Sequence, residues 1–133
     1  GLLQGVKDGT LAICSNHQAQ DIAAKKAPFA AAEPGMSILD SWLAMMLTLV
    51  NQKELSLEAI ANASSILPAK ILGLEPGLQV GKQANLVVVE PDTEVCLTTD
   101  QLASTGKNNP VLGAALVGKV QLTFSNGRVV FQA

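Results

Sequence analysis

The stretch Asp8-Gly-Thr-Leu-Ala-Ile-Cys-Ser-Asn-His-Gln-Ala-Gln20 decides how the rest of the chain is interpreted. A Gly-Thr turn leads into an apolar run over residues 10–14, and a polar cluster follows at residues 15–20. In a parallel α/β sheet the strands are buried, and ligands are met at their carboxyl ends. The pattern therefore predicts a buried strand at 10–14 with a site after it. Asn16 stands where a carboxylate would be best placed for chemistry.

The composition limits the size of the fold and the kinds of partner that the protein can bind. The chain has 133 residues, 48% of them hydrophobic and 15% charged, which is enough for one domain with a modest core. The net charge is -2, no basic stripe is present and only 3% of residues are aromatic, so we expect no nucleic-acid partner.

Membrane insertion and disulfide formation are not expected either. The most apolar run, residues 38–50, contains Asp40 and is shorter than the roughly 20 residues that span a bilayer. The first residues do not form a signal peptide, so we expect a soluble, cytoplasmic protein without a membrane partner. Cys14 and Cys96 fall in predicted strands, which indicates buried, reduced thiols.

The hydrophobic pattern divides the chain into two parts, 1–74 and 75–133. The first part predicts a helix end at 2–7, the strand at 10–14, a long loop at 19–35 and three helices. These helices are expected at 38–50 with Ser37 as N-cap, from Ser56 to about Asn62, and from Ser65 to Gly73.

The second part predicts a small β module. Strands are expected at 84–89, 94–98, 120–124 and 129–131, with Glu90-Pro91-Asp92 closing the first and Asn126-Gly127 forming a hairpin turn. A chain that opens with a helix end running into a buried strand, without a starting Met, suggests a piece of a longer protein.

Several motifs follow one another in a distinctive order. They are Lys7-Asp-Gly-Thr10, Ser15-Asn-His17, Lys26-Ala-Pro-Phe29, Ala32-Glu-Pro-Gly35, Ser65-Ile-Leu-Pro-Ala-Lys-Ile-Leu-Gly-Leu74, Val80-Gly-Lys-Gln-Ala-Asn-Leu-Val87 and Ser104-Thr-Gly-Lys-Asn-Asn-Pro110. Together they resemble the last third of bacterial dihydroorotases of the amidohydrolase superfamily, over essentially the whole chain. The pattern at residues 80–87, Val-Gly-x-x-Ala-Asn-Leu-Val, is shared by many amidohydrolases. The opening stretch and the Lys-Asn-Asn-Pro loop narrow the resemblance to dihydroorotases.

The resemblance implies an α/β fold: the last strand and closing helices of a metal-dependent-hydrolase barrel of the TIM type, plus a small C-terminal β domain. It also implies that the family's His-x-His metal pair and other ligands lie upstream. We therefore expect no cofactor and no metal site in this chain, and zinc only if the full-length protein keeps those ligands.

The resemblance also bears on catalysis. In dihydroorotases the last strand ends in Asp-His-Ala-Pro-His, where the Asp binds metal and acts as general acid and base, and the second His helps to bind substrate. The aligned residues here run from Asn16 to Gln20, and only His17 is retained. An amide cannot take a proton from a metal-bound water, so Asn16 is a degenerate catalytic position. The resemblance leaves His17, Gln20 and Gly35 as remnants of a substrate pocket.

Two functions stay open at this stage. Noncatalytic dihydroorotase-like chains hold the assembly of aspartate transcarbamoylase together in some bacteria, and this sequence resembles them, so we expect that enzyme's catalytic chain as partner and self-association as well. The alternative is an active dihydroorotase whose base comes from another residue. On their own, His17 fits a hydrogen-bonded structural residue, and Ser15-Asn16 fits a local cap.

Overall fold

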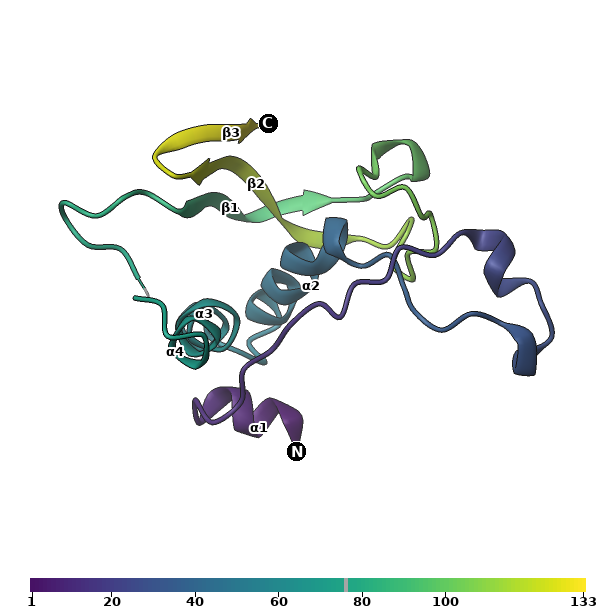
Figure 1. The fold of residues 1–133 in the computed structure, drawn as a ribbon, viewed down its shortest axis with the longest axis horizontal. Coiled ribbons are helices and arrows are strands. Elements are labelled where there is room, and N and C mark those ends of the chain that lie inside the picture. Colours follow the sequence, from purple (N-terminus) through teal and green to yellow (C-terminus); the bar gives the residue numbers. More distant parts are fainter. Residues whose placement is uncertain (76) are drawn as a thin grey trace.

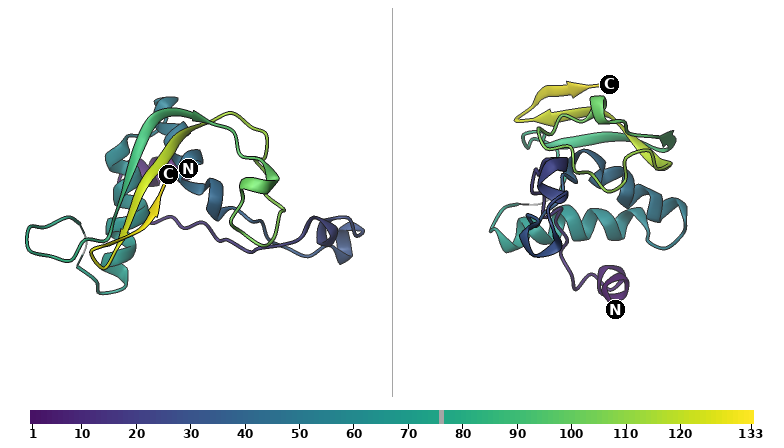
Figure 2. Two further views of the ribbon diagram at one scale, coloured as in Figure 1. Left: turned by 90° about the horizontal axis from the view of Figure 1, so that it is seen from above. Right: turned by 90° about the vertical axis from the view of Figure 1, so that its right-hand side faces the viewer.

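The computed structural model describes residues 1–75 and 77–133. A three-stranded antiparallel sheet lies on one side, the helix α2 (Leu39–Asn51) lies beneath it, and the remaining helices lie beyond α2 (Figures 1 and 2). The two ends of the chain lie on opposite sides of this stack in Figure 1. The segment before α2 projects away from the layers and carries two short 3-10 turns, Ile22–Lys25 and Phe29–Ala31.

The predicted helix at 38–50 is confirmed as α2, with its cap different from expectation. The N-cap position is Ile38, and no side chain at that position caps the helix. Ser37 is fully buried instead, and its hydroxyl has no partner among the residues that the structure describes. The prediction of Ser37 as N-cap is therefore wrong, and the helix start is satisfied by another residue.

Of the other helices, α1 (Leu2–Lys7) stands alone at the start of the chain, and α3 (Leu57–Ala61) and α4 (Leu67–Ile71) are joined without a break. A π turn (Asn62–Ile66) connects α3 to α4. The Ser56 hydroxyl accepts a hydrogen bond from the Ala59 N–H at 3.1 Å, as predicted for an N-cap. The predicted break after Asn62 is absent: Pro68 has no N–H, and a wider turn before it relieves the crowding that its ring causes.

The sheet has the order β1-β2-β3, formed by β1 (Leu86–Val95), β2 (Leu116–Ser125) and β3 (Arg128–Gln132). The strands predicted at 84–89 and 94–98 are one strand with a register shift between Glu90 and Glu94. Pro91 lies in that interval and cannot donate to a ladder, so it produces an irregularity rather than an end. The predicted hairpin turn is confirmed, with φ of 52° at Asn126 and 76° at Gly127.

The strand predicted at 10–14 is not formed. The segment is extended, and the Ile13 N–H donates to the Ala63 carbonyl of the π turn at 2.9 Å. A β-strand is defined by its partner, and within 1–75 and 77–133 no other strand lies beside this segment. The expectation of buried thiols is also wrong for the described residues, because Cys14 and Cys96 are both exposed there.

The core lies on both sides of α2. On one side Val6, Leu55, Ile60 and Ala63 form a buried cluster. On the sheet side Leu47 is only 1% exposed, and a Cβ on Gly118 of β2 would lie 2.4 Å from its Cδ1. Gly118 therefore lets β2 approach α2 closely. Along the described chain no helix is long and apolar enough to cross a membrane.

Candidate functional site

Three segments that are far apart in sequence meet at the start of α2. They are residues 16–20, residues 35–41 and the loop 102–110 between β1 and β2. Figure 1 shows this loop passing beside the segment that precedes α2. The residues predicted as the site lie in the first two of these segments, and the third was not predicted to reach them.

His17 holds the start of α2. Its Nδ1 accepts hydrogen bonds from the N–H groups of Ile38 at 3.1 Å and Leu39 at 3.0 Å. These are first-turn amides that have no acceptor inside the helix, so the imidazole replaces the missing cap. Because Nδ1 accepts both bonds, the neutral ring carries its proton on Nε2. His17 thus has the structural role that its sequence alone also suggested.

Gln20 and Gly35 lie on either side of the loop 102–110. The Gln20 carbonyl accepts the Asn108 N–H at 3.0 Å, and the Gly35 carbonyl accepts the Asn108 side-chain amide at 3.2 Å. Gly35 has a φ of 112°, and a Cβ there would lie 2.4 Å from the Gln18 Oε1, so glycine is required. The structure therefore brings Gln20 and Gly35 together through Asn108.

Asn16 is exposed and has a left-handed backbone, with φ of 44°. Asparagine is one of the few residues apart from glycine that adopts this conformation routinely. The sharp turn sends the chain from the extended 10–15 segment into the polar cluster, with His17 directed toward α2. The position predicted to be a degenerate catalytic one is thus a turn residue at the surface of the described chain.

The structure gives Asp40, the acid in the first turn of α2, partners that the sequence did not predict. Asp40 accepts a hydrogen bond from the Ala103 N–H at 2.8 Å and another from the Ser104 hydroxyl. Partial burial acts to raise the pKa of Asp40, and the hydrogen bonds from the Ser104 hydroxyl and the Ala103 N–H outweigh it, so the pKa is lowered. The sequence feature that pointed to this loop was the Lys107-Asn-Asn-Pro110 motif, but the motif does not show which residues the loop contacts.

The side chains near the start of α2 do not form a metal centre by themselves in the described chain. Among residues 1–75 and 77–133, no three His, Cys, Asp or Glu side chains lie close enough together to hold a metal ion. His17 Nδ1 is occupied by backbone N–H donors, and Asn16 offers only a neutral amide. These two residues therefore do not fit a metal ion by themselves.

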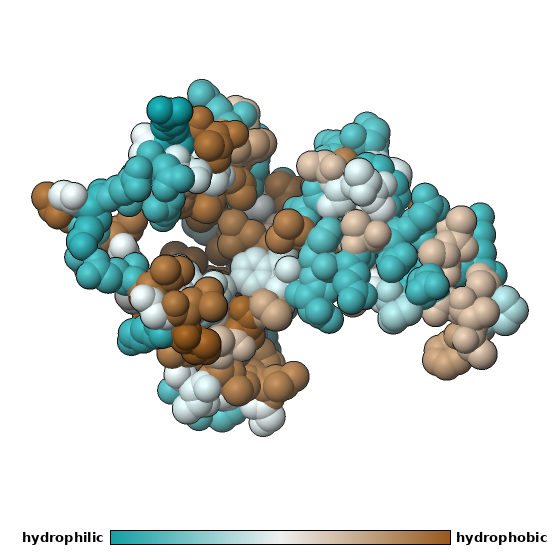
Figure 3. All heavy atoms as spheres, in the orientation of Figure 1, coloured by the Kyte–Doolittle hydropathy of each residue, from teal (hydrophilic) through white to brown (hydrophobic). Residues whose placement is uncertain are grey.

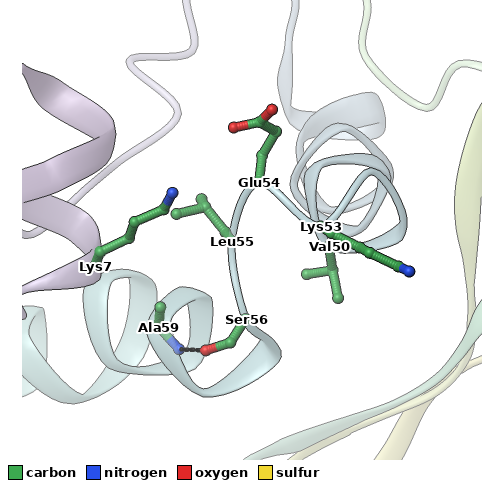
Figure 4. A pocket seen from close by; sticks show the side chains of 7 residues that line it. All are labelled: Lys7, Val50, Lys53, Glu54, Leu55, Ser56 and Ala59. Carbon is green, nitrogen blue, oxygen red and sulfur yellow. Dashed lines mark hydrogen bonds between the residues drawn. The ribbon is translucent and has the colours of Figure 1, made fainter.

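Two hollows lie near α2. One, of about 500 Å³, runs along the flank of the extended segment, between residues 12–15 and the apolar side chains of Leu39, Trp42, Pro68 and Ile71. The other, of about 460 Å³, lies at the far end of α2, where Lys7, Glu54 and Ser56 face it (Figure 4). In that hollow the Ser56 hydroxyl is engaged with the Ala59 N–H, so its polar group serves the helix start.

The fold and these segments place the chain in a known class. Residues 2–130 match the amidohydrolase family, so the chain belongs to that family. It is 36% identical to a dihydroorotase of Thermoanaerobacter sp. (strain X514), over 98% of this chain and 31% of that protein. It is 38% identical to a dihydroorotase-like protein of Pseudomonas aeruginosa, again over 98% of this chain and 31% of the relative. The chain therefore spans about a third of the length of these relatives.

Solved structures support the same fold. The L-hydantoinase (dihydropyrimidinase) of Arthrobacter aurescens matches with a TM-score of 0.90 and 30% identity, over 98% of this chain and 31% of that chain. The inactive dihydroorotase-like domain of a Chaetomium thermophilum multifunctional protein matches with a TM-score of 0.54 and 23% identity, over 74% of this chain and 26% of that domain, which bears on the fold alone. The predicted part of an amidohydrolase fold, with helices and a small β unit, is confirmed.

Proposed function

We propose that the protein carrying this chain is a cytoplasmic, dihydroorotase-like protein of pyrimidine biosynthesis that has lost catalysis and supports the assembly of aspartate transcarbamoylase. The observation that carries this proposal is Asn16. It occupies the position of the catalytic Asp in the dihydroorotase motif that the sequence resembles, and its amide has no basicity near neutral pH.

The surroundings of Asn16 support the same proposal. The retained His17 is committed to the start of α2 through Nδ1, and Gln20 can form hydrogen bonds but cannot exchange a proton as an imidazole does. Dihydroorotase-like proteins also stand among the relatives at 38% identity. A pocket that keeps its framework and loses its ionisable groups fits a structural role.

A structural role needs a surface for a partner. Exposed apolar side chains gather over α4 and α1, where Figure 3 shows brown surface, and include Ile71 at 74%, Leu72 at 72% and Leu2 at 81% exposure. Apolar patches of this kind mark interfaces. They support contact with further parts of the same protein, with the catalytic chain of aspartate transcarbamoylase or with a second copy of this protein.

The second candidate is an active dihydroorotase in which another residue supplies the base. The relatives at 36% and 35% identity that are dihydroorotases favour it. In that case the rest of the protein would hold the His-x-His pair and zinc. The presence or loss of that pair in the complete sequence discriminates the two candidates.

The test is a hydrolysis assay on dihydroorotate with the intact protein, with and without added zinc. We expect no enzymatic turnover from the natural protein. The double variant Asn16→Asp/Gln20→His restores the two ionisable groups and should gain turnover if the other ligands are in place. Asn126→Asp is the matched control, because Asn126 is also an exposed asparagine with positive φ, at 52°, and lies in the hairpin turn.

A normal rate from the natural protein would contradict the loss of catalysis. The structural role is tested separately by sedimentation of the intact protein alone and with the catalytic chain of aspartate transcarbamoylase. We expect the two proteins to sediment as a complex, and the Asn16→Asp variant to keep that complex. Two separate boundaries at micromolar concentration would contradict the proposed partner, and a single monomeric species of the protein alone would contradict self-association.

A further inference from the structure

The loop 102–110, which we call the clasp loop, is fixed at its start by Asp40 in the first turn of α2. The two carboxylate oxygens accept the Ala103 N–H at 2.8 Å and the Ser104 hydroxyl. The Lys107 ammonium closes the loop on itself by donating to the Leu102 carbonyl at 2.9 Å and the Ser104 carbonyl at 2.8 Å. One acidic side chain thus holds a compact, internally bonded loop.

The other end of the clasp loop contacts both segments of the candidate site. Asn108 donates its N–H to the Gln20 carbonyl and its side-chain amide to the Gly35 carbonyl, and its own carbonyl accepts the Ser37 N–H at 2.8 Å. Next to it, Gly106 lies against the Ala19–Gln20 peptide so closely that a Cβ would be 2.5 Å from the Gln20 nitrogen. Asn108 therefore joins three parts of the chain with three hydrogen bonds.

We propose that Asp40 is a positioning residue for the candidate site, and that it acts through the clasp loop on Gln20, Gly35 and Ser37. Asp40 and His17 hold the same helix turn from two sides, His17 through its N–H groups and Asp40 through the loop. The site segments have no strand ladder of their own within the described parts of the chain. Two contacts join the segments directly: His17 Nδ1 accepts the Ile38 and Leu39 N–H groups, and the Gln18 N–H donates to the Met36 carbonyl at 3.0 Å. The clasp loop adds the bonds of Asn108, which hold Gln20 against residues 35–37.

The groups around Asp40 favour an ionised carboxylate that is held in place by its hydrogen bonds. Lys107 lies on the same loop and adds a positive charge beside the hydrogen bonds that Asp40 accepts. Asp100 precedes the loop, and the Thr98 hydroxyl bonds its carboxylate and lowers its pKa. α2 carries no other charged residue between Leu39 and Asn51. Asp40 is thus the one acidic side chain of α2, and it binds the loop.

The experiment is hydrogen exchange by mass spectrometry on the intact protein, comparing peptides that cover 17–20, 35–38 and 103–108. We expect Asp40→Ala to speed exchange in all three by about tenfold or more, because hydrogen bonds to a charged group are lost and the loop opens. The Ile13 N–H, bonded to Ala63, and the β2–β3 pair should keep their protection. Asp92→Ala is the control, since Asp92 is an exposed acid on β1.

A conservative variant separates positioning from general stability. Asp40→Asn keeps one oxygen for the Ala103 N–H, and its amide can donate to the Ser104 hydroxyl, so it should retain most of the protection. Ser104→Ala removes one of the two contacts and covers the case in which Asp40→Ala does not fold. It should raise exchange in the same three peptides by a smaller factor.

Two results would overturn the proposal. One is acceleration confined to 103–108, which would show that the loop does not position the site. The other is equal acceleration throughout the protein, or an Asp40→Asn variant no better than Asp40→Ala. Exchange depends neither on turnover nor on a partner, so failure here is separate from failure of the proposed function.

Discussion

Gly106 gives the sharpest test of how the candidate site is assembled, and the perturbation is Gly106→Ala. A Cβ at this position would lie 2.5 Å from the Gln20 nitrogen, 2.6 Å from the Ala19 carbonyl carbon and 2.6 Å from the Gln20 oxygen. All three are backbone atoms, which cannot rotate away as a side chain can. The methyl group must therefore push the clasp loop away from residues 19–20.

The magnitude follows from three contributions. Overpacking against fixed atoms costs about 2 kcal/mol. Displacement of the loop also breaks the bonds from the Asn108 N–H to Gln20 and from the Ser37 N–H to Asn108, at about 1 kcal/mol each. The loss of glycine freedom in the unfolded chain offsets about 0.5 kcal/mol. The net expectation is a loss of about 3.5 kcal/mol in the free energy of unfolding.

The assay is urea unfolding of the intact protein, followed by circular dichroism. With an m-value of about 3 kcal/mol/M, the midpoint should fall by about 1 M. The control is Gly113→Ala, where a Cβ meets nothing within 4 Å but φ is 73°. That variant should cost only about 1 kcal/mol, from backbone strain alone. A Gly106→Ala midpoint equal to that of Gly113→Ala, or higher, would refute the steric argument.

Three further predictions concern α2. His17→Ala removes the acceptor of two first-turn N–H groups and should cost about 1 kcal/mol of unfolding free energy, and a variant of unchanged stability would show that His17 is not the cap. Leu47→Ala opens a cavity under β2 at a residue only 1% exposed, so thermal unfolding should report a loss of about 2–5 kcal/mol, and a loss well below that range would mean that the site collapses around the smaller side chain. Since the pKa of Asp40 is lowered from 3.8 in the folded protein, its contribution is complete above that value and is lost as the pH falls through the lower one. The stability difference between Asp40→Ala and the natural protein should therefore shrink below pH 3.8, and a difference that stays constant would contradict the hydrogen-bonded, ionised carboxylate.

The elements with local signals were predictable. The Ser56 N-cap, the helix at 38–50 and the Asn126-Gly127 hairpin depend on residues within a few positions of one another, and the structure has all three. The strand at 10–14 was predicted from an apolar run, yet strand formation needs a partner that lies elsewhere. The pattern could not show whether a partner strand lies beside these residues.

The candidate site was predicted only in part, for the same reason. Asn16, His17, Gln20 and Gly35 were found because they fall in short motifs, and the structure places Gln20 and Gly35 against Asn108. The motifs could not predict which groups those residues contact, because the partners lie far away in the sequence. Ser37 was expected to cap α2, but His17 reaches the same N–H groups from outside the helix, and Ser37 turns inward.

By itself the sequence determined the family and the order of helices followed by a small β unit, and it predicted Asn16 as a degenerate catalytic position, since all three depend on residue type and on neighbours along the chain. The tertiary structure alone decided which side chains hold the site together. The bonds of His17 to Ile38, Asp40 to Ala103 and Asn108 to Gly35 join residues 21, 63 and 73 positions apart. Contacts over such separations are set by how α2 packs against the sheet and the clasp loop, and no local pattern encodes that packing.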